Sequence, residues 1–267
     1  MTAVAAAQVR APRVSVKPIP LTRITAVELR KMFDTRSGFW LIASIAITAV
    51  LATGGVILWA PPGQLTYSTF ATAIRFPVVI ILPLIAILAV TSEWSQRTGL
   101  TTFTLIPHRN RVITAKAIGS VIIAIAAMAL TFAVGALGNL LGAAVKGTPL
   151  VWDVTFTQCL YYVLGMVLSL LVGFMLGVLI RASTGAIVAY FVLTFLLPTL
   201  FGLLASSARW FHTLQPWVDS QFAQSGLFVF DKSLTGEQWA QIGVTALIWL
   251  VIPMVIGLRL VMRSEAK

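Results

Sequence analysis

Cysteine, histidine and acidic side chains are scarce in this sequence. Its 267 residues include one cysteine, two histidines and eight acidic residues. The single cysteine, Cys159, cannot form an intramolecular disulfide or provide a cysteine cluster for a metal ion. His108 and His212 lie far apart in the sequence, on segments that we place on opposite sides of a membrane. We therefore expect no metal site.

The charged residues that are present are mostly basic. The chain carries 19 Lys and Arg against 8 Asp and Glu, for a net charge of +11. Such a surplus can indicate a nucleic-acid-binding protein. However, 58% of the residues are apolar and only 10% are charged, against about 45–50% and about 25% in soluble domains. Membrane proteins concentrate Lys and Arg on cytoplasmic loops, so the composition predicts a polytopic membrane protein and no nucleic-acid partner.

Six apolar runs are long enough to cross a bilayer as helices, which takes about 20 residues. The predicted spans are residues 38–59, 72–91, 117–145, 154–180, 184–205 and 239–261. The predicted fold is all-α, with a single transmembrane domain over residues 21–263. Three prolines argue against regular helix in residues 1–20, for which we predict a disordered cytoplasmic arm.

A short amphipathic helix is predicted before the first span, at about residues 21–36. Its apolar residues fall on one side at 3.6 residues per turn, although Glu28 lies on that side too. Thr25 and Glu28 have the spacing of a capping box. The pattern favours a helix on the membrane surface, with basic residues near anionic headgroups. The alternative is a plain cluster of charges next to the membrane.

The distribution of basic residues predicts the orientation. With six spans, both termini lie on one side, and all but four of the 19 basic residues fall there. The four exceptions are Arg75, Lys146, Arg209 and Lys232. The positive-inside rule therefore places both termini in the cytoplasm.

The loop between the second and third spans, residues 91–116, is polar and basic. Apolar residues alternate with threonine in its middle, and charged residues flank them. This arrangement is typical of a short coupling helix that inserts apolar side chains into a groove on a partner. The alternative is a basic loop without a partner.

The spans contain few groups that could do chemistry. Residues 117–145 and 154–180 include no ionisable side chain apart from Cys159 and the tyrosines, which disfavours an ion-coupled carrier. No phosphate-binding G-x-x-x-x-G-K-[ST] loop and no H-E-x-x-H motif occurs, which disfavours an enzyme. Five residues are candidates for a substrate path: Thr48, Asn139, Gln158, Thr194 and Arg75. The alternative is that the polar residues bond only within their own helices and that Arg75 reaches the membrane interface.

Two G-x-x-x-G patterns, Gly138 to Gly142 and Gly173 to Gly177, allow close approach of helix backbones. They predict tight packing, either inside the bundle or at a dimer interface. The segment of residues 206–238 is rich in Trp and Phe, which favours helices that dip into the outer membrane interface.

The sequence resembles the ABC-2 type permeases, the membrane subunits of one class of ATP-binding-cassette exporter. The resemblance covers about residues 21–263 and rests on four features: a basic helix at residues 25–36, six spans, the loop pattern, and the aromatic outer segment with Pro216. The loop pattern reads Glu93-x-x-x-Arg97-Thr98-Gly99 followed by Pro107-x-x-x-Arg111-x-x-x-x-Lys116.

The resemblance implies a dimer of permeases with two copies of a separate ATPase. ATP and Mg would bind to that ATPase, with no cofactor on this chain. The implied ATPase-docking residues are Glu28, Glu93, Arg97, Leu100, Phe103, Leu105, Pro107 and Arg111. We expect a non-catalytic subunit in a bacterial cell membrane that exports a lipophilic or amphipathic compound such as a drug, a natural product or a lipid. The alternatives are a lipid-modifying membrane enzyme and an ion-coupled carrier.

Overall fold

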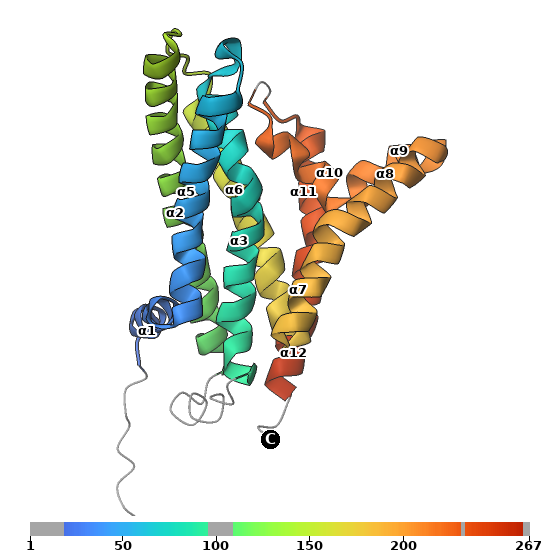
Figure 1. The fold of residues 1–267 in the computed structure, drawn as a ribbon. Coiled ribbons are helices and arrows are strands. Elements are labelled where there is room, and N and C mark those ends of the chain that lie inside the picture. The colour runs from blue at the N-terminus through green and yellow to red at the C-terminus, as the bar shows by residue number, and fades with distance from the viewer. Residues whose placement is uncertain (1–18, 96–108, 231–232, 264–267) are drawn as a thin grey trace, which may run out of the picture.

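The described part of the protein is a bundle of long helices (Figure 1). A computed structural model describes residues 19–95, 109–230 and 233–263. Within these ranges every regular element is helical. The predicted all-α fold is confirmed. Residues 1–18 of the predicted disordered arm and residues 96–108 of the predicted coupling helix lie outside the described ranges.

Six helical segments in the described ranges are long and apolar enough to cross a membrane, as predicted. The first four are single helices, α2 (Arg36–Trp59), α3 (Tyr67–Ser95), α5 (Arg109–Lys146) and α6 (Phe156–Ile180). The fifth consists of α7 (Ser183–Phe191), a π-helical segment η2 (Val192–Leu196) and α8 (Leu197–Ser207). The sixth consists of α11 (Gly236–Ala246), a π-helical segment η4 (Leu247–Val251) and α12 (Ile252–Arg263).

Two helices begin five or more residues before the predicted spans. Helix α3 begins at Tyr67, where Ser68 donates from its backbone N and its Oγ to the Asp153 carboxylate, at 2.8 and 2.6 Å. Helix α5 begins at Arg109, so Lys116 lies in a helix and not in the predicted loop. Hydropathy marks only the apolar part of a helix, whereas these polar first turns are held by residues distant in sequence.

Helix α3 is the central element, because α2, α5, α6 and α7 all contact it. The two predicted glycine patterns serve this packing inside one chain. A Cβ at Gly138 would lie 2.5 Å from Thr53 Cγ2 of α2, and one at Gly173 would lie 2.7 Å from the Pro83 carbonyl of α3. Gly142 and Gly177 face Phe70 and Val90 of α3 in the same way.

Helix α1 (Leu21–Asp34) lies across one end of the bundle, which we call the α1 end. Figure 1 shows that α12 also ends there, so both described chain ends are on the same side. The short elements η1 (Pro62–Gln64), α9 (Arg209–Val218), α10 (Ser220–Ser225) and η3 (Gly226–Phe228) lie elsewhere, away from that end.

The aromatic outer segment packs back onto the bundle. The ring of Phe228 lies so close to α6 that a Cβ at Gly165 would be 2.4 Å from it. Phe230 stacks on the buried Tyr162 with ring centroids 5.4 Å apart. The Arg75 guanidinium lies over the Phe228 ring, 4.3 Å from its centroid, in cation–π geometry. The aromatic residues therefore fix this segment to α3 and α6.

Candidate functional site

The buried face of α1 is not wholly apolar. It consists of Ile24, Thr25, Glu28 and Met32, in agreement with the predicted amphipathic pattern. The proposed capping box is wrong, because the helix begins at Leu21, four residues before Thr25. The Thr25 hydroxyl instead donates to the Leu21 carbonyl within the helix, at 3.0 Å. Glu28 is therefore free of a capping role.

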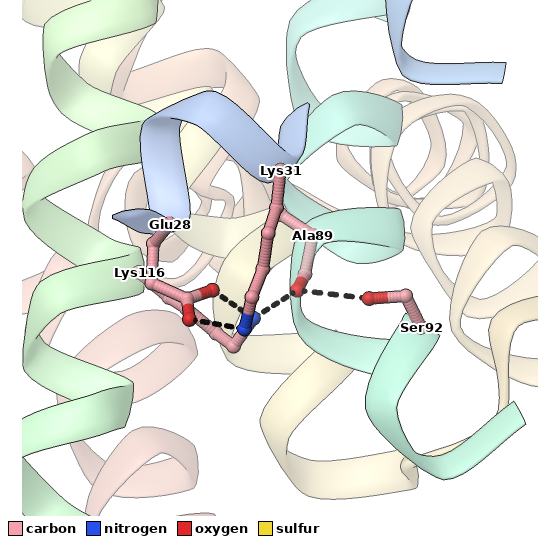
Figure 2. A network of polar contacts seen from close by, with 5 residues as sticks. All are labelled: Glu28, Lys31, Ala89, Ser92 and Lys116. Carbon is pink, nitrogen blue, oxygen red and sulfur yellow. Dashed lines mark hydrogen bonds and ion pairs between the residues drawn. The ribbon is translucent and has the colours of Figure 1, made fainter. Parts of the chain in front are cut away.

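Glu28 forms a buried ion pair with a lysine of α5. Its Oε2 is 2.5 Å from Lys116 Nζ, and its Oε1 is 2.7 Å from Lys31 Nζ one turn along α1. Glu28 and Lys116 are only 3% and 4% exposed. Lys116 Nζ also donates to the Ala89 carbonyl of α3 at 3.0 Å, as Figure 2 shows. Ser92 Oγ donates to the same carbonyl at 3.3 Å.

We call these five residues, Glu28, Lys31, Ala89, Ser92 and Lys116, the charged junction. Burial by itself raises the pKa of Glu28, but attraction and hydrogen bonds from Lys116 and Lys31 outweigh burial, and the pKa ends below its ordinary value. The carboxylate is thus held ionised between two ammonium groups. The carbonyl that Lys116 bonds lies inside α3 (Tyr67–Ser95), six residues before its end.

Further polar contacts tie the same end of the bundle together. Arg111 of α5 donates to the carbonyl of Ile19, just before α1, at 2.6 Å. Thr91 of α3 and Ser183 at the start of α7 are hydrogen-bonded through their hydroxyls at 3.0 Å. The α1 end is therefore cross-linked from α1 through α5 and α3 to α7.

Two of the predicted ATPase-docking residues, Glu28 and Arg111, lie at this end and point into it. The others fall outside the described side chains: Glu93, Arg97, Leu100, Phe103, Leu105 and Pro107. Helix α3 ends and α5 begins at the α1 end, as Figure 1 shows. Lys31 and Lys116 were not predicted as site residues. The available signal was Glu28, a carboxylate on an otherwise apolar helix face.

The predicted path residues do not gather in one place. Thr48 donates to carbonyls of its own helix, and Gln158 caps the start of α6 with Thr155. Asn139 is buried and donates to the Val151 carbonyl, whereas its Oδ1 has no partner in the described chain. Arg75 covers Phe228. Thr194 lines a cleft together with Ser169 and Tyr190.

Within the described ranges, no three residues among His, Cys, Asp and Glu are grouped so that they could hold a metal ion. A comparison of the sequence with protein-family models and with curated proteins found no match.

Proposed function

We propose that this chain is the permease subunit of an ATP-driven exporter of the ABC-2 type, powered by a separate ATPase. The observation that supports this proposal is the charged junction, which couples a helix outside the spans to two spans. The resemblance of the sequence to the family is independent support.

A helix that only rests on a membrane surface does not need a buried ion pair. Removing a carboxylate and an ammonium from water carries a large desolvation penalty, so such pairs are weak contributors to stability. Here the pair joins α1 to α5, and Lys116 extends the connection to α3. A displacement of α1 or of the segment between α3 and α5 would therefore be passed to both spans. This is the mechanical property that a permease driven from outside the membrane requires.

The exposed face of α1 supplies a contact surface for such a partner. Arg23 and Arg30 are exposed there beside the apolar Val27 and Phe33. Apolar anchors with charges around them are typical of protein–protein contacts. In the proposed complex two permease copies bind two ATPase copies in a bacterial cell membrane, with both termini in the cytoplasm and an amphipathic compound as substrate.

The test is purification of the tagged chain from its own host in mild detergent, followed by reconstitution into proteoliposomes. We expect an ABC-type ATPase in equal amount, vanadate-sensitive ATP hydrolysis, and ATP-dependent movement of a fluorescent amphiphile. Glu28→Gln should lower the amount of amphiphile moved per ATP severalfold, because α1 would no longer be tied to α5 by charge. The matched control is Asp153→Asn, a carboxylate of the opposite end.

Two results would reject the proposal in favour of one of the alternatives. If the purified chain modifies lipids without a partner, the enzyme alternative holds. If a proton or sodium gradient drives transport in the absence of ATP, the ion-coupled carrier holds.

A further inference from the structure

A narrow cleft lies between α6, the fifth span, α10 and the sixth span. Its cavity volume is about 20 Å³, room for one small polar group. Its lining includes Ser169, Thr194, Asp219, Gln224 and Trp249. Ser169 lies near the middle of α6 (Phe156–Ile180), so the cleft reaches halfway along a span. The hydroxyls of Ser169 and Tyr190 are hydrogen-bonded there at 3.2 Å.

Two buried polar side chains of the cleft are incompletely matched. Gln224 is 6% exposed, and within the described chain its amide has no hydrogen-bond partner. Asp219 is 3% exposed, and no cation pairs with it among the described residues. Its Oδ1 accepts the backbone N–H groups of Gln221 and Phe222, and its Oδ2 accepts from Gln215 Nε2 at 3.2 Å. The Asp219 carboxylate is therefore hydrogen-bonded but has no counter-charge among the described residues, and a cation in the cleft would supply one.

Two prolines lie close to the cleft. Pro198 is two residues after the end of η2 and Pro253 is two residues after the end of η4, and neither has an N–H to donate. The N–H of Leu197 bonds the carbonyl of Val192, and the N–H of Ile252 bonds the carbonyl of Leu247, each five residues earlier as in a π-helix. Thr194 and Trp249, each four residues before a proline, line the cleft.

The cleft thus offers the Asp219 carboxylate and the Gln224 side-chain oxygen as hydrogen-bond acceptors. None of the described residues that line it is basic. We propose that this cleft binds the ammonium headgroup of an amine-bearing amphiphile. The N–H groups of the ammonium match the Asp219 carboxylate and the oxygen of Gln224. Trp249 is fixed at the wall by a 2.7 Å hydrogen bond from its Nε1 to the Val218 carbonyl, and its ring face can attract a cation.

The apolar tail of such a ligand has a place outside the narrow cleft. Phe195, Leu196, Leu200 and Leu203 are exposed along η2 and α8. A hydrocarbon chain packed there moves from apolar lipid to a similarly apolar protein surface. That the bound amphiphile is the transported substrate rests on the proposed function, whereas binding itself needs no ATPase.

The experiment measures binding of radiolabelled dodecylamine to the purified chain in lipid nanodiscs, with empty nanodiscs as the background. We expect saturable binding that unlabelled dodecylamine displaces. Dodecyltrimethylammonium, which has the charge but no N–H, should compete more weakly, and dodecanol and dodecanoate should not compete. Asp219→Asn keeps an acceptor that can cap α10 but removes the charge. It should weaken dodecylamine binding about tenfold, or about 1.4 kcal/mol.

Gln224→Met removes the amide, keeps the length of the side chain and leaves the Asp219 cap of α10 intact. It should weaken dodecylamine binding severalfold. Asp153→Asn is the control outside the cleft and should bind as the parent chain does. Absence of saturable binding, equal competition by dodecanol or dodecanoate, or an unchanged affinity in Asp219→Asn would overturn the proposal. If Asp219→Asn does not fold, Gln224→Met decides, and an unchanged affinity in that variant overturns it. A chain that binds dodecylamine but recruits no ATPase would refute only the transport role.

Discussion

Glu28 is the residue whose position conflicts most clearly with its chemistry. It lies on the face of α1 that otherwise buries Ile24 and Met32, and the pairing with Lys116 and Lys31 makes this burial tolerable. Replacement of a whole buried ion pair by apolar residues is often neutral or stabilising, whereas removal of one partner is strongly destabilising. The pair is therefore better explained by a mechanical role than by stability.

This reasoning predicts a specific double-mutant cycle. Glu28→Leu alone removes a carboxylate from the buried Lys116 and should lower the free energy of unfolding by about 3 kcal/mol or more. The double variant Glu28→Leu with Lys116→Met should be close to the parent chain in stability. Unfolding followed by circular dichroism in detergent measures both. Additive losses in the double variant would contradict the prediction.

The same variants predict a pH dependence. The pKa of folded Glu28 is lowered, so its contribution to stability is present above the ordinary glutamate pKa of about 4.3 and is lost as the pH falls through the lowered value. The melting temperature of the parent chain should thus drop more on acidification than that of the double variant. Asp153, whose pKa is also lowered through its hydrogen bonds with Ser68, is unchanged in both and cancels from the difference. Parallel pH profiles would show that Glu28 does not contribute.

At the scale of elements, α3 and α6 cross with their backbones in close contact. Gly173 rests directly on the backbone of Pro83, and Gly177 faces Ile87 and Val90 one turn further. Pro83 lies inside α3, and its ring and the glycine together allow the two backbones to approach. Small residues of this kind set helix distances in membrane proteins.

A methyl group at this crossing should therefore be costly. In Gly173→Ala the new Cβ would lie 2.7 Å from both the carbonyl oxygen and the Cβ of Pro83, and rigid backbone cannot yield. We expect a loss of about 1–3 kcal/mol, the usual cost of overpacking. The matched control is Gly202→Ala in α8, where nothing lies within 4 Å of the added atom, and which should be neutral or stabilising because alanine favours helix. Equal melting temperatures for the two variants would contradict the assigned contact.

The sequence predicted the elements better than their connections. All six spans were found because length and hydropathy are local properties of the chain. The early starts of α3 and α5 were missed because their polar first turns depend on Asp153 and on the Ile19 carbonyl. Asp219 and Gln224 were seen only as part of an aromatic outer segment. Their burial depends on how α10 folds back against α6 and the sixth span, which no local pattern encodes.

At the scale of the whole molecule, the charged junction shows the same limit. The conspicuous residue, Glu28, could be identified by its helical phase alone. Its partner Lys116 is 88 positions away and was counted among the loop charges that set orientation. Basic residues near a membrane have two uses, orientation and pairing, and only the folded structure separates them.

The arrangement of ends predicts the outcome of a labelling experiment. Helix α1, the end of α12 and the start of α5 share one end of the bundle. This end holds most of the basic residues of the described ranges, which the positive-inside rule places in the cytoplasm. In a Cys159→Ser background, Gly63→Cys at the opposite end should react with an impermeant thiol reagent added to whole cells. Gly63 is exposed, and nothing lies within 4 Å of an added Cβ. Asn110→Cys, exposed at the α1 end, should react only after the membrane is permeabilised. Labelling of Asn110→Cys in intact cells, with protection of Gly63→Cys, would invert the orientation and place the charged junction outside, where an ATP-driven partner could not reach it.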